Sequence, residues 1–332
     1  MKARPLPKDW ESWEYRMSID QTSGYIAVLL KEVLEYLNSK NGGKFVDATV
    51  GSGGHIKAIL ESNPKNLGLG IDLDQTSLDK LRDKLTRIGL SQRLKLVAGN
   101  YRDIDRILSD MGWLKVDGIL LDLGFSSVQL NDPSRGFSFA SEGLLDMRYD
   151  QSAELTADSV VNRYHPKDLE RIIFAYGEEK LTRRIVAKIV ATRKISQIKT
   201  TTELAAVIKS TVPLPRRFKA ADHIRRVFQA IRIEVNSELK NLTAALPKML
   251  EALNPQGRLA VISFHSLEDR IVKEFFVSEA KDCVCPPEFP TCICNKASTL
   301  RILNKKPIVA SDEEVAINSR SKSAKLRVVE KI

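Results

Sequence analysis

The chain has 332 residues, a hydrophobic content of 43% and a formal net charge of +10 at pH 7. This length and composition are typical of a globular protein with a large core, built as one domain with an insertion or as two domains. No segment approaches the ~18 apolar residues of a membrane span, and residues 1–17 have no apolar run typical of an export signal, so we expect a cytosolic protein without a membrane partner.

Strand and helix patterns alternate through the first part of the chain. In chain order they predict a helix over 28–38, a strand over 44–48, a helix over 54–62, a strand over 67–72, a helix over 75–88, and strands over 93–98 and 117–122. Such alternation indicates an α/β fold with a mostly parallel sheet and helices on both faces.

Strand patterns then disappear, and helical patterns with basic faces replace them, notably "EEKLTRRIVAKIVATRK" and "TTELAAVIKSTV". We therefore predict an inserted helical domain over 131–219, between two parts of one sheet domain at 23–130 and 220–332. Residues 1–22 form an N-terminal extension, for which a disordered arm is one interpretation.

Sheet character resumes after a long amphipathic helix, which "LNPQG" ends. Its apolar residues recur at helical spacing: Ile224, Val227, Phe228, Ile231, Val235 and Leu239. The pattern then predicts a strand over 258–264, and "KLRVV" near the C-terminus predicts a last edge strand.

Positive charge is concentrated in the predicted insertion. Between Thr182 and Arg226 there are 12 Lys or Arg residues against two acids, Glu203 and Asp222. This local excess equals the net charge of the whole chain, +10. A solvated helix face is the ordinary explanation, and nucleic-acid binding is an alternative of about equal weight.

The stretch "VDATVGSGGH" (46–55) joins a predicted strand to a predicted helix through three glycines. Such a loop lies where open parallel sheets bind ligands, and Asp72, which ends the next strand, stands at the right distance to bind a ribose. Asp47 gives the pattern D-x-x-x-G-x-G, while the third glycine of the dinucleotide pattern would fall at Ile56. S-adenosylmethionine, a dinucleotide and a simple flexible turn all remain open on this loop alone.

Longer motifs carry a resemblance to a known family. "MLEALNPQGRLAVISFH" has the helix, turn and strand order typical of methyltransferases. "VDATVGSGGH", "LLDLGFSSVQLNDPSRGFSFASEGLLDMRYD", "VFQAIRIEVNSEL", "ISFHSLEDRIVK" and "INSRSKSAKLRV" together closely resemble the RsmH (MraW) family, from about Gly24 to Ile332. The chain departs from the family pattern at Tyr25, Ala27, Phe125 and Val128.

The resemblance implies a class I methyltransferase fold and an activity. These enzymes transfer a methyl group from S-adenosylmethionine to the exocyclic amine (N4) of a cytidine in the decoding region of 16S rRNA, in the small ribosomal subunit. The implied cofactor contacts are Gly53, Gly54, His55, Asp72, Tyr101, Asp122 and Gln129. Two other functions remain as alternatives: an inactive rRNA-binding assembly factor and an NAD-dependent oxidoreductase.

Candidate catalytic residues follow two strand ends. Methyl transfer to a cytosine amine benefits from a hydrogen-bond acceptor on that amine, and Asp122 in "DLGF" is a candidate, with Phe125 as a base-stacking surface. His265 in "SFHSLEDR" is a second candidate acceptor, with a structural role of similar weight. For Asp146 and Arg148 we favour a structural ion pair over substrate contact.

All four cysteines stand in one short stretch, as Cys283, Cys285, Cys292 and Cys294. We expect reduced thiols and no metal, because the spacing within each pair is narrower than is usual for zinc sites. The alternative is a structural zinc site.

Overall fold

The computed structural model describes residues 19–20, 25–283, 285–286, 293–294 and 296–332. Most of the N-terminal extension, and Cys292, lie outside these residues. The chain divides into two compact units: Met1–Gly124 with Asn241–Ile332, here named the sheet unit, and Phe125–Lys240, here named the helical unit.

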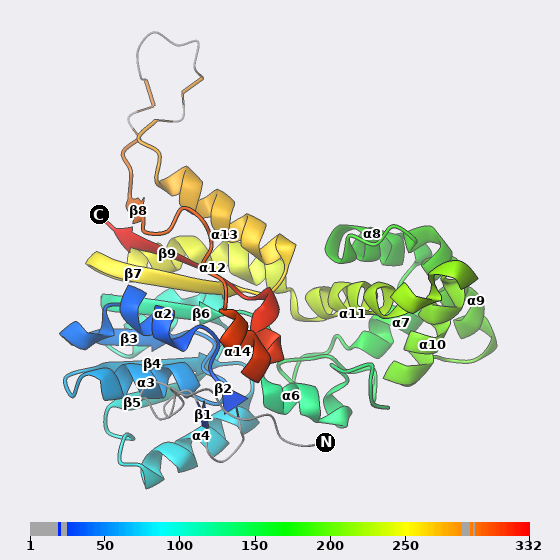
Figure 1. Ribbon diagram of the computed structural model, residues 1–332, viewed down its shortest axis with the longest axis horizontal. Helices are drawn as coiled ribbons and strands as arrows, with labels where there is room; N and C mark the ends of the chain where they lie inside the picture. The colour runs from blue at the N-terminus through cyan, green and yellow to red at the C-terminus, as the bar shows by residue number, and fades with distance from the viewer. Residues whose placement is uncertain (1–18, 21–24, 284, 287–292, 295) are drawn as a thin grey trace. The chain divides into compact units, whose positions relative to one another are not determined.

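The sheet unit is built on seven strands (Figure 1). Their order across the sheet is β5 (Leu94–Ala98), β4 (Leu67–Asp72), β3 (Lys44–Asp47), β6 (Val116–Asp122), β7 (Leu253–Ser263), β9 (Lys325–Lys331) and β8 (Leu300–Ile302). Neighbours from β5 to β7 pair in parallel, whereas β9 pairs antiparallel with both β7 and β8. The predicted fold class, a mostly parallel sheet of the class I methyltransferase type, is confirmed.

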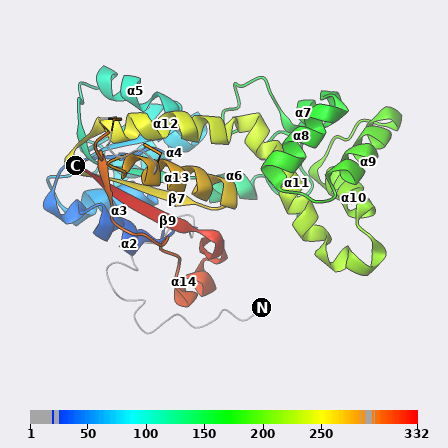
Figure 2. The same ribbon diagram turned by 90° about the horizontal axis from the view of Figure 1, so that it is seen from above.

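Helices cover both faces of this sheet, as Figure 2 shows from above. One core joins the sheet to α2 (Leu30–Tyr36), α3 (Gly54–Ser62) and α4 (Gln75–Arg87). A second core joins the other face to α5 (Ile104–Asp110), α12 (Glu238–Ala252) and α13 (Ser266–Glu279).

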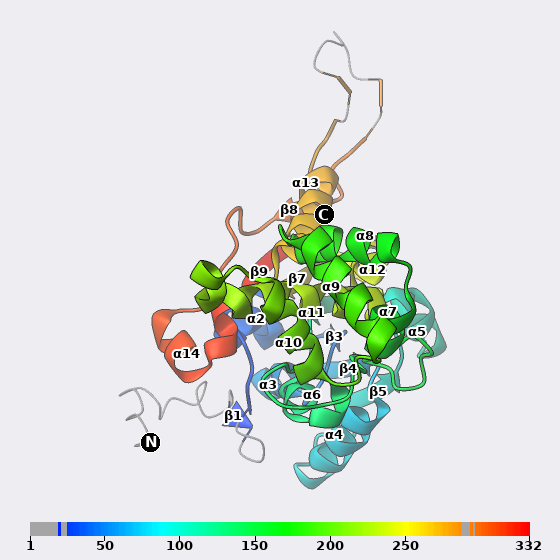
Figure 3. The same ribbon diagram turned by 90° about the vertical axis from the view of Figure 1, so that its right-hand side faces the viewer.

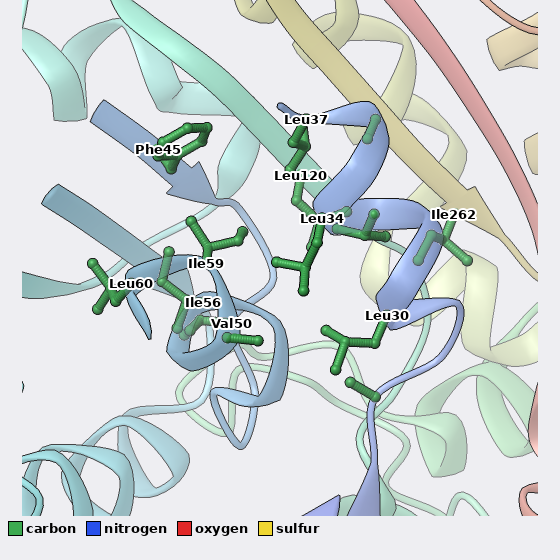
Figure 4. Packing of buried hydrophobic residues seen from close by; sticks show 14 of the residues in the cluster. Leu30, Leu34, Leu37, Phe45, Val50, Ile56, Ile59, Leu60, Leu120 and Ile262 are labelled. Carbon is green, nitrogen blue, oxygen red and sulfur yellow. The ribbon is translucent and has the colours of Figure 1, made fainter. Parts of the chain in front are cut away.

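Side chains along a strand alternate between the two cores. In β3, Phe45 belongs to the first core and Val46 to the second, and in β6 the buried Leu120 lies in the first core between neighbours in the second. Figure 4 shows Leu34 and Ile59 approaching Leu120 from α2 and α3. This alternation is the period of two that a pleated strand imposes, and it explains why the strand patterns read as continuous apolar runs.

Several shorter elements complete the described chain. They are β1 (Ile19–Asp20), β2 (Tyr25–Ile26), α14 (Asp312–Ile317), and the 3-10 helices η1 (Ser39–Asn41), η2 (Tyr101–Asp103), η3 (Pro133–Arg135), η4 (Leu214–Lys219) and η5 (Ser319–Ser323). None of the helices in the described part of the chain combines the length and apolar character that crossing a bilayer requires.

The helical unit has a hydrophobic core of its own, and Figure 3 shows its helices. Its helices are α6 (Ser127–Asn131), α7 (Ala157–Arg163), α8 (Pro166–Gly177), α9 (Thr182–Ile195), α10 (Thr201–Thr211) and α11 (Ala220–Asn236). The α11 helix packs closely on α8, since a Cβ atom added at Gly177 would lie 2.8 Å from the Arg226 carbonyl oxygen.

Three details differ from the sequence-based expectations. The long helix is broken at Ser237, whose φ of 51° is left-handed. The part before the break, α11, belongs to the helical unit, whereas the sequence pattern groups residues 220–332 with the sheet. The C-terminal strand β9 is not an edge strand, because the unpredicted β8 pairs with its outer side. The β7 strand begins at Leu253 and includes the "NPQG" stretch that was expected to be a turn.

Candidate active site

Three carboxylates meet at the carboxyl edge of the parallel strands. Asp47 is the last residue of β3, Asp72 of β4 and Asp122 of β6. The three strands are neighbours, with β3 in the middle. In open α/β sheets this edge is where ligands bind.

Backbone hydrogen bonds tie the glycine loop to these strand ends. The Gly51 N–H donates to Asp72 Oδ2 at 2.8 Å, and the Asp74 N–H donates to Asp72 Oδ1 at 2.9 Å. Thr49 Oγ1 accepts the Asp122 N–H at 2.8 Å. The ribose-binding candidate, Asp72, is therefore oriented by the loop that the sequence singled out.

The loop enters α3 with a left-handed backbone. Gly53 has a φ of 81°, and an added Cβ atom would collide with the Leu81 side chain, so glycine is needed there on two grounds. Among the described residues, no side-chain hydrogen bond caps the N-terminus of α3. First-turn N–H groups at such a helix end attract anions, which suits the methionine carboxylate predicted at Gly53, Gly54 and His55.

Asp47 is almost fully buried, with 2% of its surface exposed. Its pKa is raised to about 7, chiefly by burial and also by the nearby Asp72 carboxylate, while hydrogen bonds from the Thr49 and Ile56 N–H groups act in the opposite direction. This residue was noted in the glycine motif but was not among the predicted site residues.

His55 is a buried, neutral imidazole. Burial lowers its pKa to about 4. Nε2 lies 2.9 Å from the Val28 carbonyl oxygen, an acceptor, so Nε2 carries the proton. Nδ1 is then unprotonated and lies 3.7 Å from Asp122 Oδ2. His55 therefore gives Asp122 no compensating positive charge at neutral pH.

Asp122 lies close to two other acidic side chains at this edge, Asp47 and Glu268. Burial raises its pKa well above the ordinary value, and the Asp47 and Glu268 carboxylates raise it further. Its Oδ1 atom is buried and has no hydrogen-bond partner among the described residues. A buried carboxylate without compensation is costly, and a cationic ligand would relieve that cost.

Tyr101 begins η2, just beyond the carboxyl end of β5, the strand next to β4. It is half-buried and packs against the second core of the sheet unit. Tyr101 thus follows the strand next to the one that carries Asp72, and its role beside the adenine stays a prediction.

Comparison with known proteins decides the family. The family model described as "MraW methylase family" matches residues 22–332. The chain belongs to the MraW methylase family. It is 48% identical over 309 residues to the ribosomal RNA small subunit methyltransferase H of Caldicellulosiruptor saccharolyticus, covering 93% of this chain and 99% of the relative. The proteins of the same name from Heliobacterium mobile and Brevibacillus brevis are 46% and 43% identical, over 93% of this chain and 99% and 98% of theirs.

In this member of the MraW methylase family, Gln129 lies in the helical unit. Its Oε1 atom accepts the Ser126 N–H at 2.9 Å, and its own N–H donates to Ser126 Oγ at 3.2 Å. These two bonds form a capping box at the start of α6. The structure explains the residue as a helix cap, and its role toward the cofactor stays a prediction.

His265 caps α13, which follows β7. Its Nδ1 atom accepts the Glu268 N–H at 3.4 Å, while Glu268 Oε2 accepts the Phe264 N–H at 2.9 Å. The Nε2 atom lies 3.1 Å from Glu268 Oε1 without hydrogen-bond geometry, and it has no other partner among the residues described. Capping gives His265 a structural role, and the predicted catalytic role stays a prediction.

Other polar residues near these motifs are used by the fold. Asp269 pairs with Arg327 at 2.6 Å and with Lys325 at 3.3 Å, both on β9. Asp146 and Arg148 form the predicted ion pair, with 2.6 Å between Oδ2 and Nη2.

Phe125 lies in an aromatic stack within the helical unit. Its ring stacks on Phe137, with centroids 5.4 Å apart, and Phe137 stacks on Tyr149. The Arg232 guanidinium lies 5.0 Å from the Phe125 ring centroid. The ring is held in place by these neighbours, and its predicted role in base stacking stays a prediction.

Proposed function

We propose that this chain transfers a methyl group from S-adenosylmethionine to N4 of one cytidine in the decoding region of 16S rRNA, within the small ribosomal subunit. Membership of the MraW methylase family and relatives named as small-subunit rRNA methyltransferases support the rRNA substrate. The choice of N4 and of the decoding region follows from the sequence resemblance.

The observation that carries the proposal is the uncompensated Asp122 carboxylate, with Asp47 and Glu268 close enough to raise its pKa. S-adenosylmethionine has two positive groups, the sulfonium and the α-ammonium, and one carboxylate. Buried carboxylates would hold the positive groups, while the uncapped start of α3 would hold the carboxylate. The donor set of this edge therefore fits the cofactor, with Asp72 for the ribose and Tyr101 beside the adenine.

When bound, S-adenosylmethionine supplies a methyl group on a positively charged sulfur, which is electrophilic without further activation. The chain's own residues have to orient the cytidine amine and hold one of its protons. Asp122 Oδ1 can accept a hydrogen bond from that amine. A cation held nearby lowers the pKa of Asp122, so the carboxylate is ionised when it has to accept.

The helical unit supplies an exposed cationic surface for RNA. Among the basic residues between Thr182 and Arg226, the exposed ones are Arg183, Arg184, Lys188, Lys194, Lys199, Lys209, Arg216, Arg217, Lys219, Arg225 and Arg226. Arg193 differs, since it donates to the Val161 and Tyr164 carbonyl oxygens and so holds the fold together. Phosphate contacts from such a surface would provide affinity.

The η4 segment adds an aromatic side chain to this surface. Phe218 is 78% exposed and stands between Arg217 and Lys219 in the sequence. Exposed aromatic rings beside basic residues stack on unpaired bases in single-stranded RNA. We therefore place the RNA contact of the helical unit at η4 and the exposed side of α9.

The proposal is tested with labelled S-adenosylmethionine and small subunits that lack the decoding-region mark. We expect label on N4 of one cytidine, located by nuclease digestion and mass spectrometry. Cofactor binding without label on any cytidine would contradict the proposed substrate. RNA binding with no cofactor binding would contradict the enzyme and favour the inactive assembly factor.

His265 is tested in the same assay. If its Nε2 atom positions the amine, His265→Ala lowers the rate of transfer at saturating cofactor, and so does a control variant that keeps the cap and therefore the melting temperature. His265→Asn is that control, because asparagine restores the α13 cap without the ring. Full activity of His265→Ala would leave the residue with its capping role alone.

A further inference from the structure

Three cysteines lie together in the segment that connects α13 to β8. The Sγ atoms of Cys283, Cys285 and Cys294 all lie within 4.8 Å of one another. Cys283 and Cys294 are 11 residues apart in the sequence, yet their Sγ atoms lie 3.8 Å apart. The close pair therefore comes from the outgoing and returning parts of the segment, and the narrow Cys-x-Cys spacing does not decide the geometry.

The 3.8 Å between the Cys283 and Cys294 sulfur atoms matches the separation of thiolates around a metal. Zinc–sulfur bonds of ~2.3 Å in a tetrahedron place the sulfur atoms ~3.8 Å apart. The thiol groups also differ from ordinary buried cysteines, because Cys283 is exposed and the other two are half-buried. A cysteine that only fills space belongs among the most buried residues, so packing does not explain the cluster.

Backbone N–H groups point at two of the sulfur atoms. The Cys285 N–H donates to Cys283 Sγ at 3.3 Å, and the Ile293 N–H donates to Cys285 Sγ at 3.4 Å. Donors of this kind stabilise negative charge on sulfur, which is the form that binds a metal. The cluster thus has ligands and part of the surrounding hydrogen bonding.

The described part of this connection between α13 and β8 lacks regular structure. From Lys281 to Thr299 the described residues form no helix or strand. Its base is closed by the Ser298 N–H donating to Asp282 Oδ1 at 3.1 Å and by Lys296 pairing with Glu279 at 3.2 Å. A metal clip stabilises a long connection by removing the entropy of the open loop.

We propose that Cys283, Cys285 and Cys294 bind one zinc ion as a structural site, with a fourth donor completing the tetrahedron. Each thiol loses its proton on binding Zn²⁺, so binding releases protons to solvent and weakens at low pH. The site orders the connection between α13 and β8 and takes no part in methyl transfer.

The test uses the full, untagged chain purified under reducing conditions. We expect about one zinc per chain by elemental mass spectrometry. Replacement by Co²⁺ gives the intense visible absorption of a tetrahedral thiolate site, and a chelator that removes the metal lowers the melting temperature. Absence of zinc, or the pale spectrum of six-coordinate cobalt, would overturn the proposal.

Two variants and a control locate the ligands. Cys283→Ser and Cys294→Ser lose the bound metal, while Lys296→Ala keeps it, since that change breaks only the ion pair with Glu279 in the same segment. If the serine variants fail to fold, the cobalt spectrum of the unchanged chain still decides the outcome. Zinc retained in full by both serine variants would contradict the site.

Discussion

The edge of the sheet and the surface of the helical unit use charge in opposite ways. At the edge, Asp47 and Asp122 are acidic groups that burial makes costly to ionise. On the helical unit, basic side chains such as Arg183 and Arg216 are exposed to water. The first arrangement lowers the stability of the fold until a cationic ligand binds. The second has little effect on stability and leaves the basic groups accessible to a polyanion.

The difference teaches how one chain can recognise two charged ligands independently. Buried charges act over short distances in a medium that salt screens weakly, so they select a small cofactor by fit. Exposed charges act through solvent and are screened, so they give affinity for many phosphates without defining one nucleotide.

The largest effect is expected from Asp122→Asn. The change keeps the size of the side chain and removes the acceptor charge, so methyl transfer at saturating cofactor should fall by about 100-fold or more. Single-turnover transfer to unmarked small subunits measures it. Asp110→Asn, an exposed carboxylate in the sheet unit, is the matched control and should be fully active. Equal rates for the two variants would remove Asp122 from the chemistry.

Charge reversal on the helical unit should act on RNA alone. Replacing Arg183, Arg184, Arg216 and Arg217 with glutamate should weaken rRNA binding about 100-fold and flatten its salt dependence, while cofactor affinity stays unchanged. Binding of a labelled rRNA fragment over a salt series measures this. The control is reversal of Lys80 and Arg87, both exposed on α4 of the sheet unit. An unchanged salt slope would take this surface out of the interface.

Cofactor affinity should depend on pH through Asp47. With its pKa raised to about 7, this carboxylate is mostly protonated at pH 6 and mostly ionised at pH 8. A cationic ligand prefers the ionised form, so affinity should be about tenfold weaker at pH 6 than at pH 8. Calorimetry at three pH values measures it, and Asp47→Asn should give a flatter profile. If the cofactor affinity of the unchanged chain did not depend on pH, ionisation of Asp47 would not be linked to cofactor binding.

The smallest effect is on the stability of the protein without ligand. The pKa of Asp47 is about 7 in the folded chain and near 3.8 in the unfolded chain, so the folded state binds the extra proton between these values. This contribution to stability is complete below about pH 4 and is lost as the pH rises to about 7. Asp47→Asn should therefore raise the melting temperature at pH 8 by a few degrees relative to the unchanged chain, and by less at pH 5. Thermal unfolding at both pH values measures the effect. A lower melting temperature for Asp47→Asn than for the unchanged chain at pH 8 would contradict a destabilising effect of the ionised Asp47.

Local patterns predicted most of the sheet unit. The helix at 54–62 and the strand at 67–72 have the predicted bounds, because apolar periodicity and glycines define them within a few residues. The break at Ser237 could not be predicted, because a serine seldom adopts the left-handed conformation and no local pattern marks the position where it does. The place of β9 between β7 and β8 is likewise a tertiary property, because the sequence pattern of a strand does not indicate which strands pair with it.

The sequence predicted only part of the site, because contacts between residues distant in the chain again left no local pattern. Gly51 and Asp72 were paired from their spacing, and the structure joins them by a hydrogen bond. The effect of Asp47 and Glu268 on the pKa of Asp122 could not be predicted, because the three residues are distant in the chain and their electrostatic interaction depends on burial. An acidic residue at the end of each central strand was the signal that could have pointed to it.

The pairing of β6 with β7 has a consequence for how the protein is made. These strands are parallel neighbours in the middle of the sheet, yet the whole helical unit is synthesised between them. At ~5–20 residues per second, the ribosome needs roughly ten seconds after finishing β6 to produce its partner. During that interval the apolar β6 strand has an unpaired edge, which favours aggregation. The inserted helices make local contacts and can fold rapidly, and their folding would shorten the distance between the end of β6 and the start of β7.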